Sequence, residues 1–316
     1  MNRDTDGWGL KDLLAAARDG ENRAGARLLT RGERGGSPAD EIAEATHLLS
    51  RDAHIVGITG APGSGKSTIT SAVATHLIEE GHHPAGVAVD PSSPLTGGAI
   101  LGDRVRMESA TASGVFVRSF ATRGHSGGLS VAVPGVIRVL DACGFGPIVI
   151  ETVGVGQVEV DVAAMADTTV VVVTRGWGDA VQANKAGLLE VGDIFVVNKA
   201  DRLGAEDARR DLELMLDLSE ISGLDAGLRP PICKTIATSS EGISQLIVAI
   251  HDHNRLLRLG KGLMESRKNR VISEIRARLT HRVAEEIDRA LEGERLDSSI
   301  SPVLAAEQIV GGLFRK

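Results

Sequence analysis

The stretch that decides the fold is His54-Ile-Val-Gly-Ile-Thr-Gly60-Ala-Pro-Gly-Ser-Gly-Lys66-Ser-Thr-Ile-Thr70. Its centre has the pattern Gly, four residues, Gly-Lys-Ser, which is typical of a loop whose backbone N–H groups surround a phosphate. An apolar run precedes the loop, and residues 68–77 have the composition of a helix. A glycine-rich turn that matched the pattern by chance would not need an apolar strand before it and a helix after it. The order strand, loop, helix therefore favours a phosphate-binding loop for a nucleoside triphosphate.

Two side chains of this loop carry specific chemistry. Lys66 is expected to reach the β- and γ-phosphate oxygens, and the Ser67 hydroxyl is expected to bind Mg²⁺. The glycines are needed because they tolerate unusual dihedral angles and let the backbone approach a phosphate closely. The predicted nucleotide-binding residues of the loop are Gly60, Ala61, Pro62, Gly63, Ser64, Gly65, Lys66, Ser67 and Thr68.

The composition of the chain limits its class. It has 316 residues, of which 42% are hydrophobic, and its mean hydropathy is +0.02. This is enough to bury a full core, most simply as one large domain with appended helices. The net charge is −7 and the pI about 5.8, so neither nucleic acid nor an anionic membrane is expected as the principal partner.

Aromatic residues make up only 2% of the chain, and tyrosine is absent. The core must then consist of Val, Ile, Leu and Ala, as in buried parallel strands covered by helices, which predicts an α/β fold. Cys143 and Cys233 lie in unrelated contexts, which is typical of a reduced, cytoplasmic protein. The first residues are polar and no window approaches 18 apolar residues, so neither a signal peptide nor a membrane-spanning helix is expected.

Hydrophobic periodicity divides the chain into three parts. Residues 1–52 are predicted to form an N-terminal helical arm, residues 53–255 the nucleotide-binding domain, and residues 256–316 a C-terminal helical extension. The extension is expected to contain a long charged helix with one apolar stripe. The stripe either docks on the domain's own core or serves as a self-association arm, and the pattern does not decide between them. It consists of Val271, Ile272, Ile275, Leu279, Val283, Ile287 and Leu291.

Acidic residues follow two predicted strands and are candidate Mg²⁺ ligands. Asp90 ends the strand over residues 85–90, and strand C-termini line the ligand crevice of such sheets. Asp90 could also cap an Asp-Pro turn. Beyond it, Asp103 and Arg106 lie on a glycine-rich segment, where they would help to hold Mg²⁺ and to meet transition-state charge. A plain helix start with solvated charges is the alternative for this segment.

The second nucleotide motif begins with Glu151, which ends the apolar run 147–150. Its carboxylate is expected to hold Mg²⁺ through water, and the Gly154 N–H to contact the γ-phosphate. Gln157 is placed where it could orient the attacking water, although position alone supports that role.

Another apolar run ends in Asn198-Lys199-Ala-Asp201. An Asn-Lys-x-Asp sequence at a strand end is the guanine reader of GTPases, because its aspartate accepts hydrogen bonds from two adjacent donors that adenine does not present. The tetrapeptide could be a solvated turn, but its place well behind the phosphate loop and after its own strand favours guanine. Ala237 and Thr238 follow the last predicted strand and are expected to close over the base.

The nine histidines are scattered. His82-His83 and His251-x-His253 would bind a metal only with further ligands, so the simpler interpretation is solvated surface positions.

Taken together, these motifs closely resemble the MeaB/ArgK family, whose sequences were formerly described as LAO/AO transport ATPases. The resemblance covers about residues 50–260. It implies a P-loop fold of the SIMIBI type, with a mostly parallel sheet of about seven strands flanked by helices and helical extensions at both ends. The sequence motifs on which the resemblance rests are Gly60–Thr68, Val89-Asp-Pro-Ser-Ser93, Gly97-Gly-Ala-Ile-Leu-Gly-Asp103, Glu151-Thr-Val-Gly-Val-Gly-Gln157, Gly178-Asp179 and Asn198-Lys-Ala-Asp201.

The resemblance also implies a function. Members of this family are GTPases that act as chaperones of the adenosylcobalamin-dependent methylmalonyl-CoA mutase, protecting it or gating its cofactor loading. A homodimer, GTP and GDP as ligands, and Mg²⁺ as cofactor are implied, whereas nucleic acid and membrane are not. A transport ATPase gains no support from a chain without a predicted membrane segment.

One segment departs from the family pattern. Arg175 replaces the proline that usually precedes Gly-x-Gly-Asp after the valine-rich strand. The resemblance makes this segment a third switch that faces the partner, with Trp177, Asp179 and Lys185 as its candidate residues. A rigid strand-to-helix turn is the alternative, and the arginine strengthens it.

Two rival functions remain from the sequence. A nickel-insertion GTPase of the same class should carry a Cys/His metal site, and the sequence pattern shows none. A nucleotide-dependent scaffold that does not hydrolyse GTP would be excluded by single-turnover hydrolysis.

Overall fold

The computed structural model describes residues 7–33, 36–91, 111, 113–122, 132–152, 164–175, 190–221, 229–293 and 301–313. The chain divides into two compact units, Met1–Arg270 and Val271–Lys316. The first unit holds the sheet, the phosphate loop and residues 198–201, the predicted guanine-reading motif.

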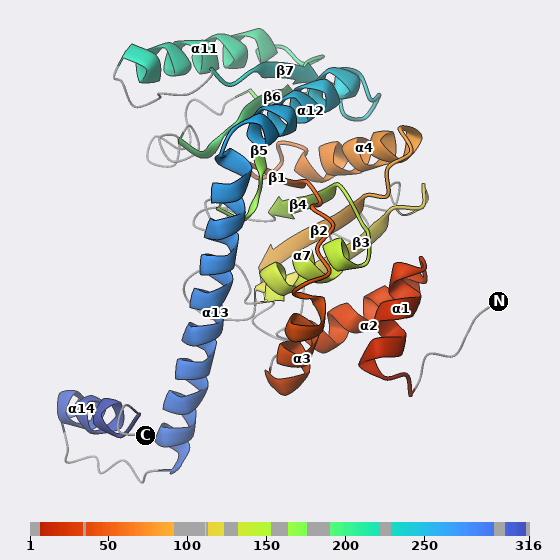
Figure 1. Cartoon of the computed structure of the whole chain (residues 1–316). Helices are drawn as coiled ribbons and strands as arrows, with labels where there is room; N and C mark the ends of the chain where they lie inside the picture. The colour runs from red at the N-terminus through yellow and green to blue at the C-terminus, as the bar shows by residue number, and fades with distance from the viewer. Residues whose placement is uncertain are drawn as a thin grey trace. The chain divides into compact units, whose positions relative to one another are not determined.

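The first unit is built on a seven-stranded sheet in the order β3-β2-β4-β1-β5-β6-β7 (Figure 1). Each pair of neighbouring strands is parallel, which confirms the predicted α/β class. All carboxyl ends therefore lie at one edge, where open α/β sheets bind their ligands. The strands are β1 (Ile55–Gly60), β2 (Ala85–Pro91), β3 (Phe116–Thr122), β4 (Ile148–Thr152), β5 (Thr168–Val173), β6 (Ile194–Asn198) and β7 (Ile232–Thr235).

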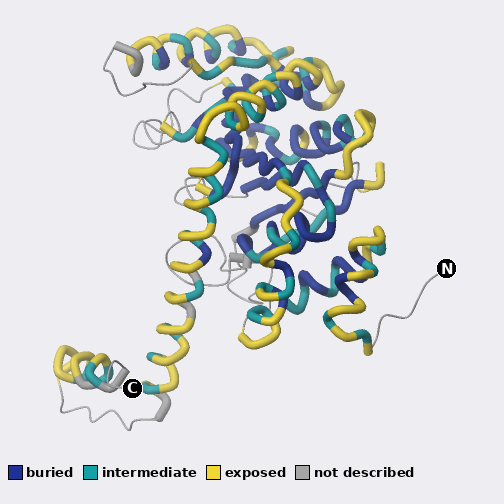
Figure 2. Tube along the Cα trace, viewed as in Figure 1, coloured by how far each residue is buried: buried dark blue, intermediate teal, exposed yellow. Residues whose placement is uncertain are grey.

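The central strands are buried on both faces (Figure 2). In β5, Val170 and Val172 pack into one core whereas Val171 and Val173 pack into the opposite one. This follows from the two-residue repeat of a strand, because successive side chains point to opposite faces. β-Branched residues suit such doubly buried strands, which explains why the sequence reads as a continuous valine run.

Helices cover both faces of this sheet. On one face, α4 (Lys66–Glu79) and α12 (Ile243–Leu259) share a core with β1, β5 and β6. On the other, α7 (Ala132–Ala142) covers β2 and β4, and α11 (Ala205–Ile221) covers β5 and β6. The arrangement is the three-layer architecture expected from alternating strands and helices.

The predicted N-terminal helices form and join the main core. α1 (Leu10–Arg18), α2 (Asn22–Glu33) and α3 (Gly36–Thr46) bury their apolar faces in the same cluster as α7. A hydrogen bond from the Arg118 guanidinium to the Thr30 hydroxyl, 2.8 Å long, links α2 to β3.

The C-terminal part is helical, as predicted. α13 (Gly262–Gly293) begins in the first unit and ends in the second, which also contains α14 (Pro302–Leu313). Most of the predicted apolar stripe of α13 is exposed; Ile275 and Leu279, for example, are 52% and 59% exposed. Among the described residues, no helix is both long and apolar enough to cross a membrane.

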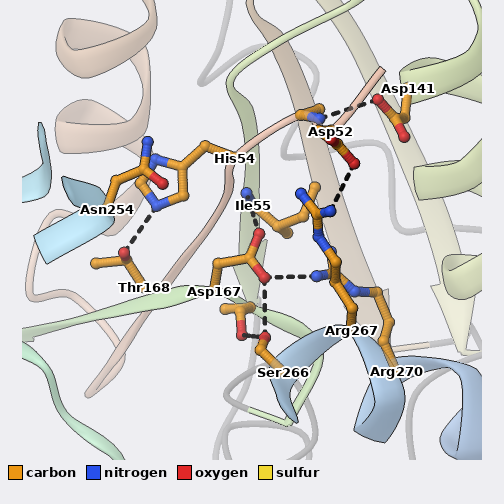
Figure 3. Close-up of polar contacts among 12 residues, drawn as sticks. Asp52, His54, Ile55, Asp141, Asp167, Thr168, Asn254, Ser266, Arg267 and Arg270 are labelled. Carbon is orange, nitrogen blue, oxygen red and sulfur yellow. Dashed lines mark hydrogen bonds and ion pairs between the residues drawn. The ribbon is translucent and has the colours of Figure 1, made fainter. Parts of the chain in front are cut away.

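A polar network lies at the amino-terminal edge of the sheet, opposite the phosphate loop (Figure 3). The Asp167 carboxylate accepts hydrogen bonds from the Ile55 N–H at 2.9 Å and the Ser266 hydroxyl at 2.8 Å, and it pairs with Arg270 at 2.5 Å. Because Asp167 is fully buried, removing either partner would leave charge poorly compensated. The first turns of α13 are thus fastened to the starts of β1 and β5.

His54 belongs to the same edge and gives the fold a pH dependence. Its Nε2 lies 2.8 Å from the Thr168 hydroxyl, and burial lowers the pKa of His54 to about 4, although Asp167 raises it in part. The unfolded chain takes up this proton near pH 6.5, so between about pH 6.5 and 4 the unfolded state binds more protons. We expect the free energy of unfolding to fall by about 3 kcal/mol as the pH drops through this window.

The measurement is urea unfolding at several pH values for the native chain and for His54→Gln. In the His54→Gln variant, the free energy of unfolding should fall less steeply as the pH drops from about 6.5 to 4. His47→Ala removes an exposed imidazole and should keep the native slope. Equal slopes for the native chain and His54→Gln would contradict the assignment.

Candidate functional site

The phosphate loop joins β1 to α4 and depends on glycine at two positions. Gly60 has φ 136°, and a Cβ there would lie 2.1 Å from the Val172 carbonyl oxygen of the neighbouring strand. Gly65 has φ 95°, and its Cβ would lie 2.3 Å from the Asn198 Nδ2. Gly60 therefore excludes any larger side chain, and at Gly65 the left-handed backbone and the Asn198 amide both disfavour one, so the loop's curvature depends on these glycines.

Lys66 is the first residue of α4 and is buried, with 7% of its surface exposed. Its ammonium group donates hydrogen bonds to the Gly60 carbonyl at 2.6 Å and the Ala61 carbonyl at 3.0 Å. The cation is therefore held over the loop whose N–H groups would bind a phosphate. A helix N-terminus adds to the preference for an anion at this position.

Two oxygen-bearing side chains that are predicted Mg²⁺ ligands converge beside the loop. The Ser67 hydroxyl donates to the Glu151 carboxylate at 2.5 Å, although the two residues are far apart in the sequence. The parallel pairing of β1 with β4 places them, because Ile58 lies opposite Glu151 in the register. Glu151 is 1% exposed, so this carboxylate belongs to the interior of the site.

The guanine-reading motif is fastened directly to the phosphate loop. Asn198 is buried; its amide donates to the Ser64 carbonyl at 2.8 Å, and its Oδ1 accepts from the Thr235 hydroxyl at 3.1 Å and the Ala237 N–H at 3.3 Å. Lys199 donates to the Gly63 carbonyl at 2.7 Å. The ends of β1, β6 and β7 are thereby linked at one edge.

These links were not expected from the sequence. The pattern assigned Asn198 and Lys199 only to the base, whereas the structure also shows them supporting the loop. Lys199 has φ 58°, a left-handed conformation that is uncommon for residues other than glycine. That backbone turn is where the chain reverses from β6 toward Asp201.

The remaining predicted site residues divide into two groups. Asp201 and Thr238 are exposed at the same edge of the sheet, and Ala237 is buried. Asp90 lies near the end of β2, opposite Ala121 of β3. The other predicted residues lie outside the described residues: Asp103, Arg106, Gly154, Gln157, Trp177, Asp179 and Lys185.

Arg175, which departs from the family pattern, lies just after β5. It is exposed, and its guanidinium approaches the Leu203 carbonyl at 3.5 Å. Gly204 has φ 88°, and a Cβ there would lie 2.7 Å from the Arg175 Cδ. The arginine therefore packs along the turn after the guanine-reading motif.

Fold and site together define a P-loop nucleoside triphosphatase. The parallel sheet brings three features to one edge: the Gly-rich loop before α4, the buried lysine and the asparagine at a strand end. A crystal structure of an LAO/AO transport system kinase has the same fold, with a TM-score of 0.68 and 25% identity, covering 99% of each chain.

Sequence comparison gives the particular family. Residues 26–292 match the family described as methylmalonyl-CoA mutase-associated GTPase MeaB. A Pyrococcus abyssi protein whose name places it among the GTPases is 42% identical over 316 residues, which is 96% of this chain and 98% of the relative. The GTPase ArgK of Escherichia coli is 36% identical over 225 residues, which is 70% of this chain and 67% of the relative.

A third relative is larger. The fused isobutyryl-CoA mutase of Geobacillus kaustophilus is 33% identical over 254 residues, which is 76% of this chain but 23% of that protein. The chain belongs to the MeaB family of GTPases. It therefore binds guanine nucleotide and hydrolyses GTP, as the motif predictions indicated.

Proposed function

We propose that this GTPase is a chaperone of an adenosylcobalamin-dependent acyl-CoA mutase, with methylmalonyl-CoA mutase as the expected client. The fused isobutyryl-CoA mutase supports the proposal most directly, because a region related to this chain forms 23% of a protein named as a mutase. Fusion of two functions in one chain keeps them together at high effective concentration. If the GTPase and the mutase are separate chains, as proposed here, they must associate by non-covalent binding.

The experiment is co-purification with methylmalonyl-CoA mutase. We expect binding that differs between GDP and a non-hydrolysable GTP analogue, together with a change in adenosylcobalamin loading of the mutase. A GTPase that is unrelated to this family serves as the negative control. Absence of binding with either nucleotide, and loading that is unaffected by the protein, would remove the proposal.

In the proposed site, one set of residues binds the phosphates of the nucleotide and another set binds its base. Lys66 holds the β- and γ-phosphates, and the loop residues from Gly60 to Thr68 supply backbone N–H groups. Asp201 reads the two adjacent donors of guanine, while Asn198 keeps the loops together; Lys199, Ala237 and Thr238 border the base. Asp103, Arg106 and Gly154 remain predictions for the γ-phosphate side.

The same site is suited to Mg²⁺. Ser67 and Glu151 bring a hydroxyl and a carboxylate together at 2.5 Å, and both are the hard oxygen ligands that Mg²⁺ prefers. Ser67 would bind the ion directly and Glu151 through water, with Asp90 and Asp103 as further candidates. When bound, the ion would neutralise charge between the β- and γ-phosphates.

Guanine selectivity gives a direct test of Asp201. We expect Asp201→Asn to weaken GDP binding by about 2 to 4 kcal/mol, because an amide cannot replace two charged hydrogen bonds. The affinity of the variant for xanthosine diphosphate should rise relative to its affinity for GDP. Competition binding measures both, and Asp207→Asn, an exposed carboxylate on α11, is the matched control. Equal affinity of the native chain for ATP and GTP would contradict the assignment.

We also propose that the chain forms a homodimer through α13. Its exposed apolar stripe is the feature that supports this, since a stable helix rarely presents so many large apolar side chains to water. Replacing Ile275 and Leu279 with lysine should give a folded monomer in sedimentation. Glu285→Lys and Asp288→Lys, on the opposite face of the same helix, change the charge away from the stripe and serve as controls. An unfolded double variant would instead indicate docking within one chain.

A further inference from the structure

Three imidazole rings surround one carboxylate where α4 ends. The Glu80 carboxylate lies 3.0 Å from the His251 Nε2, 3.9 Å from the His82 Nε2 and 3.8 Å from the His76 Nε2. The first two contacts share the oxygen Oε2, and the third uses Oε1. The rings of His82 and His251 are 5.8 Å apart and tilted by 42°. This cluster is remote from the phosphate loop, which lies at the other end of α4.

The end of α4 is built to place two of these residues. Glu80 is the C-cap, and Gly81 adopts φ 85°, which reverses the chain. The His82 N–H then bonds to the Leu77 carbonyl at 2.9 Å, and the Gly81 N–H bonds to the Ile78 carbonyl at 2.9 Å. This is the Schellman arrangement of a helix end, and it turns His82 back toward the last turn of the helix.

α12 supplies the third residue. Its apolar face, which includes Leu246, Ile247 and Ile250, shares a core with Val73 and Leu77 of α4. His251 follows Ile250 directly, so packing of the two helices brings its ring to the end of α4. The contact joins residues 171 positions apart, which explains why the sequence pattern did not reveal it.

The other histidine of each sequence pair has a different role. His83 stacks on Phe145, with ring centroids 4.3 Å apart and an angle of 21°. His253 lies with its Nδ1 2.8 Å from the Thr168 hydroxyl. Each sequence pair therefore contributes one ring to the cluster and one ring to contacts within the fold.

We propose that Glu80, His82 and His251 form a binding site for Zn²⁺ or a similar first-row divalent ion. One ligand atom from each residue lies within 4.8 Å of the others. Tetrahedral Zn²⁺ needs nitrogen and oxygen ligands roughly 3.3 Å apart, given bonds of about 2.0 Å. The side chains are 36% to 44% exposed, so small rotations can close this difference.

The donor set determines the class of ion. Imidazole nitrogen suits Zn²⁺, Ni²⁺, Cu²⁺ and Co²⁺, whereas Mg²⁺ and Ca²⁺ prefer sites made only of oxygen. The His76 Nε2 lies 3.8 Å from the second oxygen of Glu80, close enough to become a fourth ligand after a side-chain rotation. The bound ion would tie α4, which begins with Lys66, to α12, which follows the Ala237 loop. This proposal does not depend on the mutase proposal.

The test is metal binding by the full-length, untagged chain saturated with Mg²⁺ and GDP, so that the nucleotide site is occupied. Zn²⁺ affinity is measured by calorimetry, and Co²⁺ is used as a spectroscopic probe of tetrahedral coordination. We expect His82→Ala and His251→Ala each to weaken Zn²⁺ binding by at least about 10- to 100-fold and to abolish the Co²⁺ spectrum. His47→Ala, which removes an exposed imidazole elsewhere, should bind as the native chain does.

A plain surface ion-pair cluster is the competing explanation. It predicts no Zn²⁺ binding by the native chain, or equal binding by the native chain, His82→Ala and His251→Ala, and either result overturns the proposal. Unfolding midpoints and GDP affinity check that each variant is folded. If the alanine variants fold poorly, His82→Asn and His251→Asn keep a polar side chain and answer the same question.

Discussion

Replacing Lys66 with alanine should reduce the rate of GTP hydrolysis by about 10²- to 10³-fold. Lys66 is held over the phosphate loop by the Gly60 and Ala61 carbonyls, at 2.6 and 3.0 Å. A cation placed in advance at this point stabilises the charge that develops on the transferred phosphoryl group, and alanine supplies none of it. Single-turnover hydrolysis at saturating GTP measures the effect on the chemical step.

The same substitution should leave the fold intact. Lys66 loses two hydrogen bonds to the loop, so the free energy of unfolding should change by no more than about 1 to 3 kcal/mol. Lys11→Ala, an exposed lysine on α1, is the control for loss of a positive charge. Native turnover in a folded Lys66→Ala protein would show that hydrolysis takes place elsewhere.

The largest expected effect on stability is that of Gly60→Ala, which should lower the free energy of unfolding by about 3 to 5 kcal/mol. Two penalties combine at this position. The φ of 136° is strained for any side chain, and the new Cβ would lie 2.1 Å from the Val172 carbonyl oxygen. That oxygen belongs to the backbone of β5, so relief of the clash requires a shift of the central strands.

Gly63→Ala provides the matched control in the same loop. Its φ is 73°, but within the described part of the chain no atom lies within 4 Å of a Cβ built there. Only the cost of a left-handed alanine remains, about 1 to 2 kcal/mol. Urea unfolding of both variants makes the comparison, and equal losses would mean that the contact with β5 is unimportant.

Local sequence patterns predicted most of the fold. The valine run at residues 170–173 indicated a buried strand, because continuous β-branched residues are typical of a strand covered on both faces. The phosphate loop was recognisable because its glycines, lysine and serine are adjacent in the sequence. Parallel order then followed from the alternation of strands and helices, which also placed the strand ends at one edge.

Contacts between distant residues could not be predicted in this way. The hydrogen bonds of Asn198 to Ser64 and of Lys199 to Gly63 depend on how β6 lies against the loop, which no local pattern encodes. The same holds for His82 and His251, since packing of α12 on α4 brings them together. The stripe of α13 was visible in the sequence, but periodicity describes the apolar face and not what covers it.

The two bonds between the guanine-reading motif and the phosphate loop have a kinetic consequence. Because Asn198 and Lys199 hold Ser64 and Gly63 directly, a displacement of either loop is passed to the other without involving the rest of the sheet. We therefore expect loss of the contacts with the base to accompany loss of the contacts with the phosphates, so that GDP dissociates in one concerted step. A protein that accelerates nucleotide exchange needs to disturb only one of the two loops, whichever it can reach.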